Sequence, residues 1–208
     1  MSKPNIILIG LMAVGKSTVG RMLANLLDYR FLDADQVIEA RAGAPIPWIF
    51  DREGETGFRD REQQVLDEVT RESGIVLATG GGAVLRPENR ALLKERGVVV
   101  LLESSIDRLV DRTRRDTKRP LLRQGDPREV LTRLAQERGP LYAEIAQFRF
   151  MTDRRGPKSL ARDIVNRLRE AGVLTEPCAP DAAESEQPGC DGCPWAALEE
   201  PEHGNGQR

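Results

Sequence analysis

The chain has 208 residues, of which 39% are hydrophobic, and its 31 basic and 33 acidic side chains give a net charge of −2 at pH 7. This length and apolar content favour one folded domain with a sizeable core and accessory segments. No apolar run reaches membrane-spanning length, and the apolar stretch from Asn5 lacks the flanks of a signal peptide, so we expect a cytoplasmic protein with no membrane partner.

Cysteine and histidine are confined to one end of the sequence. All three cysteines and the single histidine lie in residues 175–208, an acidic stretch with little periodicity that is predicted to be a disordered tail. The domain at 1–174 must therefore work without cysteine nucleophiles, histidine bases or soft metal ligands, which excludes most hydrolase and zinc-enzyme schemes. Phosphoryl transfer remains, because it relies on positioning, cations and Mg²⁺.

The first predicted strand and helix flank a phosphate-binding loop. A β-branched run at 5–9 is followed by GLMAVGKST and then by an amphipathic helical pattern. The loop fits G-x-x-x-x-G-K-[ST], in which backbone N–H groups cradle phosphates. It comprises Gly10, Leu11, Met12, Ala13, Val14, Gly15, Lys16, Ser17 and Thr18. Lys16 would contact the β- and γ-phosphates of ATP and Ser17 would ligate Mg²⁺, whereas the alternative is a glycine-rich turn with a solvated lysine.

The remaining strands alternate with helical patterns. They are predicted at 30–33, 75–79, 98–102 and 148–152. Such alternation is typical of a three-layer α/β/α fold with a central five-stranded parallel sheet, in which ligands bind at the carboxyl ends of the strands.

Polar or glycine-rich sequence follows two of these strands. Asp33 and Asp35 end the second, near the predicted phosphate site, although Asp35 also suits the N-cap of the next helix. Gly80, Gly81 and Gly82 follow the third, where they indicate either a close approach by a ligand or a tight turn.

Seven motifs in order give the chain a family resemblance. They are GLMAVGKSTVGR, FLDAD, IFDREGETGFRDRE, GGG, RPLL, RGPLY and TDRRGP, spread over residues 3–171. The chain resembles the shikimate kinases, which are P-loop kinases with a mobile lid. The resemblance implies a monomer that phosphorylates shikimate to shikimate 3-phosphate with ATP and Mg²⁺, on the chorismate route to aromatic amino acids.

The resemblance also implies roles for individual residues. Lys16 would bind phosphate, Ser17 would ligate Mg²⁺ directly, and Asp33 would act on the metal through water. Asp35 would hold the ring hydroxyls of shikimate and accept the proton of the attacking one.

The same resemblance implies that two arginines bind the carboxylate of shikimate. Arg59 and Arg138 would grip it with forked donors, and the three glycines would offer backbone groups to the hydroxyls. Glu62, three residues after Arg59, would orient that arginine.

A basic run lies between the fourth strand and the next helical pattern. By composition it suits a solvated surface, but the resemblance makes 112–126 the lid, with Arg119 on the transferring phosphate. Arg112 and Pro157 would sandwich the adenine, with Arg155 a further candidate beside them.

The phosphate loop departs from the family pattern at Ala13 and Val14. Alanine replaces a glycine at the first, which would cost about 1 kcal/mol if the position requires a positive φ. Two alternatives remain open: a gluconate-type kinase, which would not need Arg59 and Arg138, and a regulatory nucleotide-binding module without turnover. Scattered basic groups and 4% aromatic residues argue against nucleic acid.

The tail contains one short cysteine motif. Cys190 and Cys193 have C-x-x-C spacing, and Cys178 and His203 could complete a metal site. Because no second tight pair accompanies them, incidental thiols are favoured over zinc or redox chemistry.

Overall fold

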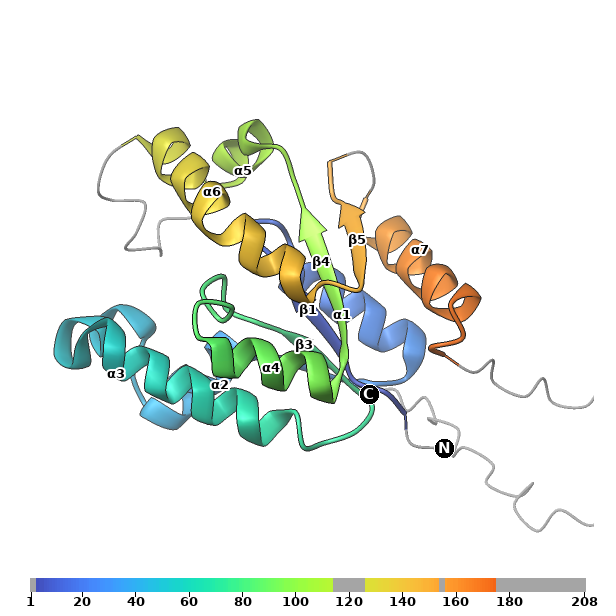
Figure 1. Cartoon of the computed structure of the whole chain (residues 1–208), viewed down its shortest axis with the longest axis horizontal. Coiled ribbons are helices and arrows are strands. Elements are labelled where there is room, and N and C mark those ends of the chain that lie inside the picture. The colour runs from blue at the N-terminus through green and yellow to red at the C-terminus, as the bar shows by residue number, and fades with distance from the viewer. Residues whose placement is uncertain (1–2, 114–125, 154–155, 175–208) are drawn as a thin grey trace, which may run out of the picture. The chain divides into compact units, whose positions relative to one another are not determined.

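The computed structural model describes residues 3–113, 126–153 and 156–174. Its sheet has five parallel strands in the order β2-β3-β1-β4-β5 (Figure 1). Their bounds are β1 Ile6–Ile9, β2 Arg30–Asp33, β3 Ile75–Ala78, β4 Val98–Glu103 and β5 Phe148–Met151. Each strand predicted from the sequence is present, with its ends shifted by at most one residue.

Helices cover both faces of this sheet. Those of the described residues are α1 Lys16–Leu27, α2 Ala34–Ala42, α3 Ile46–Val69, α4 Pro87–Arg96, α5 Ile106–Thr113, α6 Pro127–Ile145 and α7 Pro157–Glu170. Helices α1 and α7 pack together on one face, whereas α3 and α4 cover the other (Figure 1). In the part of the chain with assigned structure, no helix is both long and apolar enough to cross a membrane.

The central strand shows why the chain forms three layers. All four side chains of β1 are buried, and successive side chains point to opposite faces of a strand. Ile6 and Leu8 join the core under α1 and α7, while Ile7 and Ile9 join the core under α3 and α4. A strand that is apolar on both faces requires a helical layer on each, so the predicted α/β/α architecture is confirmed.

The strand order places one crevice at the edge where the functional loops emerge. Strand β1 lies between β3 and β4, and the chain passes from β1 through β2 and β3 on one side of it to β4 and β5 on the other. Ligands in open parallel sheets bind at such a reversal of strand order, beyond the carboxyl ends of the strands. The loops that follow β1, β2 and β3 begin at this edge, and they carry the predicted site.

Helix α3 is broken near its middle. Gly54 has φ +69° and ψ −175°, a conformation outside the helical region. Phe50 before the break stacks on Phe58 after it, with ring centroids 4.6 Å apart. The break therefore folds the first part of α3 back beside the turn that carries Arg59.

Candidate active site

The loop after β1 wraps around the Lys16 ammonium. Gly10, Ala13 and Gly15 all have positive φ, at +137°, +60° and +103°. Lys16 Nζ donates hydrogen bonds to the carbonyl oxygens of Gly10 and Leu11, at 2.8 and 2.9 Å. Position 13 therefore adopts the left-handed conformation that alanine disfavours by about 1 kcal/mol.

The start of α1 meets the end of β2 through two oxygen-bearing side chains. Ser17 Oγ donates to Asp33 Oδ2 at 2.6 Å, and Asp33 Oδ1 accepts from the Asp35 N–H at 3.1 Å. Asp33 is thus the N-cap of α2, and Asp35 lies in its first turn, so the alternative of Asp35 as N-cap is wrong. A hydroxyl beside a carboxylate is an all-oxygen donor pair, which fits the ligand preference of Mg²⁺.

A cleft of about 380 Å³ opens beside this pair. The phosphate loop from Ala13 to Thr18, Asp33, Asp35, Arg112 and Pro157 all line it. Arg112 Nη1 donates to the Val14 carbonyl at 3.1 Å and to Thr152 Oγ1 at 3.2 Å, so it joins the phosphate loop to the end of β5.

A buried ion pair stands on α3. Arg59 Nη1 lies 2.7 Å from Glu62 Oε2, and Arg59 Nη2 lies 3.2 Å from Glu55 Oε1. Glu62 is fully buried. Burial raises the pKa of its carboxyl, against the opposing effect of the Arg59 charge. The pair fixes Arg59 from two sides of its guanidinium.

The glycine loop after β3 lies against these charged groups. A Cβ on Gly80 would lie 2.7 Å from Glu62 Oε1 and 2.8 Å from Asp35 Oδ1, and a Cβ on Gly82 would clash with the Arg59 guanidinium. The loop also turns, since the Ala83 N–H donates to the Gly80 carbonyl. The triplet therefore forms a turn against charged side chains, and the close approach of a ligand stays a prediction.

The second predicted acceptor arginine comes from α6. Arg138 Nη1 donates to the Gly81 carbonyl at 3.0 Å, and the residue is 7% exposed. Its Nε is buried and has no hydrogen-bond partner in the described residues. Two buried guanidinium groups thus reach the glycine loop from different helices.

Comparisons with known proteins show which family this chain is similar to. A family model described as shikimate kinase matches residues 12–169. The shikimate kinase of Actinobacillus pleuropneumoniae serotype 5b is 54% identical over 163 residues, which cover 78% of this chain and 94% of that protein. The enzyme of Vibrio parahaemolyticus is 55% identical over 168 residues, covering 81% of this chain and 98% of its own.

The chain belongs to the shikimate kinase family.

A solved structure agrees with this membership. The shikimate kinase from Acinetobacter baumannii in complex with shikimate superposes with a TM-score of 0.79 at 47% identity, covering 81% of this chain and 94% of that one. The fold expected for a shikimate kinase is thus present in the described residues.

The structure brings together most residues predicted for a shikimate kinase site. Those that line the cleft or contact the glycine loop are Ala13, Val14, Gly15, Lys16, Ser17, Thr18, Asp33, Asp35, Arg59, Gly81, Arg112, Arg138 and Pro157. Arg119, Arg155, most of the predicted lid at 112–126 and the tail at 175–208 lie outside the described residues. Their roles stay predictions, as does the cysteine motif.

Sequence reasoning missed three residues that support the site. Glu55 precedes Arg59 by four positions, one helical turn, a signal that could have found it. Tyr142 follows Arg138 by the same interval on α6. Thr152 joins Arg112 across 40 residues of chain, and no local pattern indicates that contact.

Proposed function

We propose that the predicted residues divide the family's reaction between a donor half and an acceptor half of this cleft. The chain transfers a phosphoryl group from ATP to shikimate, which gives shikimate 3-phosphate. The observation that carries the assignment of residues is the convergence of two buried arginines, Arg59 and Arg138, on the glycine loop beside Asp35. Such paired guanidinium groups suit a small substrate with a carboxylate.

The donor half is the phosphate loop with the strand ends next to it. Lys16 neutralises charge on the β- and γ-phosphates, and backbone N–H groups at the start of α1 bind their oxygens. Ser17 and Asp33 would hold Mg²⁺, which supplies positive charge to the transferring phosphoryl group. Support comes from their 2.6 Å contact at the cleft wall. Arg112 and Pro157 line the same cleft and would flank the adenine.

Asp35 stands between the two halves. Its side chain lines the donor cleft, and its Oδ1 lies close to Gly80 on the acceptor side. A carboxylate at this position can accept the proton of the attacking hydroxyl as that oxygen bonds to the γ-phosphorus. Arg59 and Arg138 hold the carboxylate of shikimate, and Glu62 keeps Arg59 in place.

Three further assignments rest on family resemblance. Arg119 would reach the transferring phosphoryl group from the lid and stabilise its charge. The enzyme would act as a monomer. It would reside in the cytoplasm, where ATP is available.

The test is ADP release with Mg·ATP and shikimate, beside gluconate and a reaction without acceptor. We expect ADP release when shikimate is the acceptor, and none with gluconate or without an acceptor. In Arg59→Ala turnover should fall at least about a hundredfold, because a charge-assisted pair is lost, while ATP binding persists. Arg61→Ala is the matched control, since Arg61 pairs with Glu53 at the surface and should leave the rates unchanged.

Two outcomes would contradict the proposal. Equal turnover with gluconate, insensitive to Arg59→Ala, would indicate a gluconate-type acceptor site. Binding of both ATP and shikimate without any ADP formation would indicate a regulatory module.

A further inference from the structure

One carbonyl in the glycine loop receives two hydrogen bonds from α6. The Tyr142 hydroxyl donates to the Gly81 oxygen, and Arg138 Nη1 donates to the same atom at 3.0 Å. The two donors lie four residues apart on α6, one turn of helix. A carbonyl oxygen has two lone pairs, so α6 occupies both.

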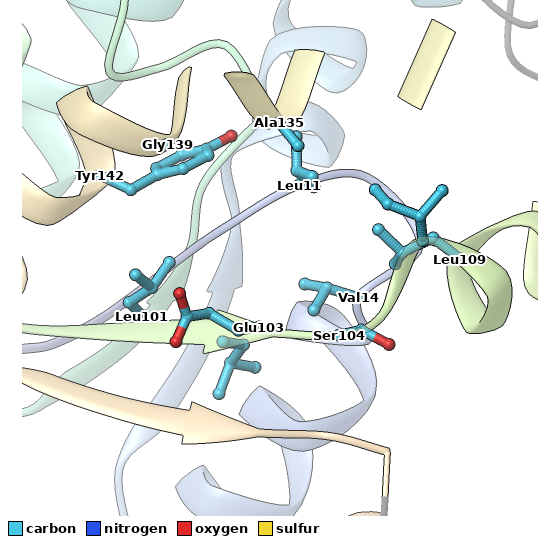
Figure 2. A pocket seen from close by; sticks show the side chains of 11 residues that line it. Leu11, Val14, Leu101, Glu103, Ser104, Leu109, Ala135, Gly139 and Tyr142 are labelled. Atoms are coloured by element: carbon cyan, nitrogen blue, oxygen red, sulfur yellow. The ribbon is translucent and has the colours of Figure 1, made fainter. Parts of the chain in front are cut away.

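The ring of Tyr142 borders an unfilled space. Figure 2 shows it at the wall of a cavity of about 150 Å³ that separates α6 from the phosphate loop and the end of β4. The cavity is lined mainly by apolar side chains, among them Leu11, Leu101 and Leu109. Packing alone fixes a side chain only where neighbours surround it. Tyr142 packs in the core on its other sides but borders this cavity on one, so its hydroxyl contact adds to packing in setting the ring orientation.

Tyr142 is equipped to keep donating this bond. The residue is 4% exposed, and burial raises the pKa of its phenol to about 12. The hydroxyl therefore keeps its proton throughout the pH range of enzyme assays. Charged neighbours that act on this phenol are Arg138, Glu62 and Arg59, the same groups that form the acceptor side.

Fixing the Gly81 oxygen also fixes groups that face the acceptor. In a trans peptide the C=O and the following N–H point in opposite directions, so the Gly82 N–H is oriented by whatever holds the Gly81 oxygen. Arg138 Nη1 is bonded to the Gly81 oxygen, whereas the buried Nε of the same guanidinium has no hydrogen-bond partner in the described residues and remains for a carboxylate oxygen.

We infer that Tyr142 is a positioning residue for the acceptor: its hydroxyl holds the Gly81 carbonyl, and through it the glycine loop and Arg138, without touching shikimate. This inference rests on the acceptor site proposed above. Tyr142 itself does not line the donor cleft, although Gly81 does, so we expect a larger effect of this residue on shikimate than on ATP.

The test is Tyr142→Phe in the full chain. We expect the KM for shikimate to rise about 3- to 10-fold, the range expected for one net hydrogen bond, with the KM for ATP unchanged within about twofold. Tyr29→Phe is the matched control, because Tyr29 is the other tyrosine of the chain and has no contact with the glycine loop in the structure. It should leave both KM values unchanged.

A double-mutant cycle distinguishes positioning from general support of the fold. If Tyr142 acts through Gly81 and Arg138, the effect of Tyr142→Phe on the shikimate KM should shrink in an Arg138→Lys background. Fully additive effects would overturn the inference. So would equal rises of the KM for shikimate and for ATP, or an unchanged shikimate KM in a variant that unfolds at the wild-type temperature. Failure of the wild-type chain to use shikimate would instead overturn the proposed acceptor.

Discussion

Ala13 adopts a backbone conformation that its side chain disfavours. Its φ of +60° lies in the left-handed region, where a Cβ crowds the following carbonyl. Ala13→Gly removes that strain of about 1–2 kcal/mol but adds freedom to the unfolded chain worth about 0.5–1 kcal/mol. We therefore expect the free energy of unfolding, measured by urea denaturation, to rise by up to about 1.5 kcal/mol.

The same substitution elsewhere should act in the opposite direction. Ala91 is exposed in α4 and has ordinary helical geometry. Ala91→Gly should lower the free energy of unfolding by about 0.5–1 kcal/mol, because glycine is a poor helix former. A fall in both variants would show that position 13 carries no strain that glycine relieves.

The protonation state of Glu62 should affect how tightly shikimate binds. Its carboxyl faces Arg59, Arg138, Asp35 and Tyr142, and burial raises its pKa above the ordinary 4.5. As pH falls, Glu62 is protonated earlier than an exposed glutamate and its charge no longer holds Arg59. We expect the KM for shikimate to rise on acidification, with a steeper rise in the wild-type chain than in Glu62→Gln.

The effect of the same proton on folding has the opposite sign. Because the folded pKa is raised, this group stabilises the fold fully below its unfolded pKa, and that contribution is lost as pH rises through the folded pKa. Acidification should thus weaken shikimate binding without a loss of stability from Glu62. KM and unfolding free energy measured on both variants at matched pH check this; a Glu62→Gln variant with the wild-type pH profile would contradict it.

Among the elements, α3 depends on a conformation reserved for glycine. Gly54 breaks the helix at φ +69° and ψ −175°, a region that other residues enter at a cost of about 1–3 kcal/mol. Gly54→Ala should lower the free energy of unfolding by that amount. It should also raise the KM for shikimate, because the break lets Phe50 stack on Phe58 next to Arg59.

A second glycine provides the comparison for this element. Gly139 lies inside α6, where an added Cβ would meet no atom within 4 Å. Gly139→Ala should stabilise the helix by up to about 1 kcal/mol. If Gly54→Ala is equally well tolerated in thermal unfolding, the break is not needed for the fold.

The elements differ in how far the sequence predicts them. Strand β1 is predictable because every residue in it is apolar and β-branched or leucine, a local signal. The phosphate loop and its lysine are local as well. The kink at Gly54 and the identity of the α2 cap depend on tertiary geometry, so the motif around Asp33 and Asp35 left the cap open. The link from Arg112 to Thr152 is non-local and leaves no periodic trace.

At the scale of the whole molecule, the last residue that the structure describes, Leu174, is also part of the hydrophobic core. Leu174 is 8% exposed and packs in the core under α1 and α7. The relatives match this chain over 163 and 168 residues, which are 94% and 98% of their own lengths. Nearly all of a shikimate kinase thus has a counterpart in this chain, and the match to the family model ends at residue 169.

We therefore expect a chain ending at Leu174 to keep kcat and both KM values within about twofold of the full chain, because every residue assigned to the proposed site precedes position 175. A chain ending at Ala171 removes Val173 and Leu174 from the core contacts. It should lose roughly 1.5–3 kcal/mol of unfolding free energy for the buried leucine alone. Steady-state kinetics and thermal unfolding of the three lengths separate the two boundaries. A large loss of activity on removal of 175–208 would instead assign the tail a part in catalysis.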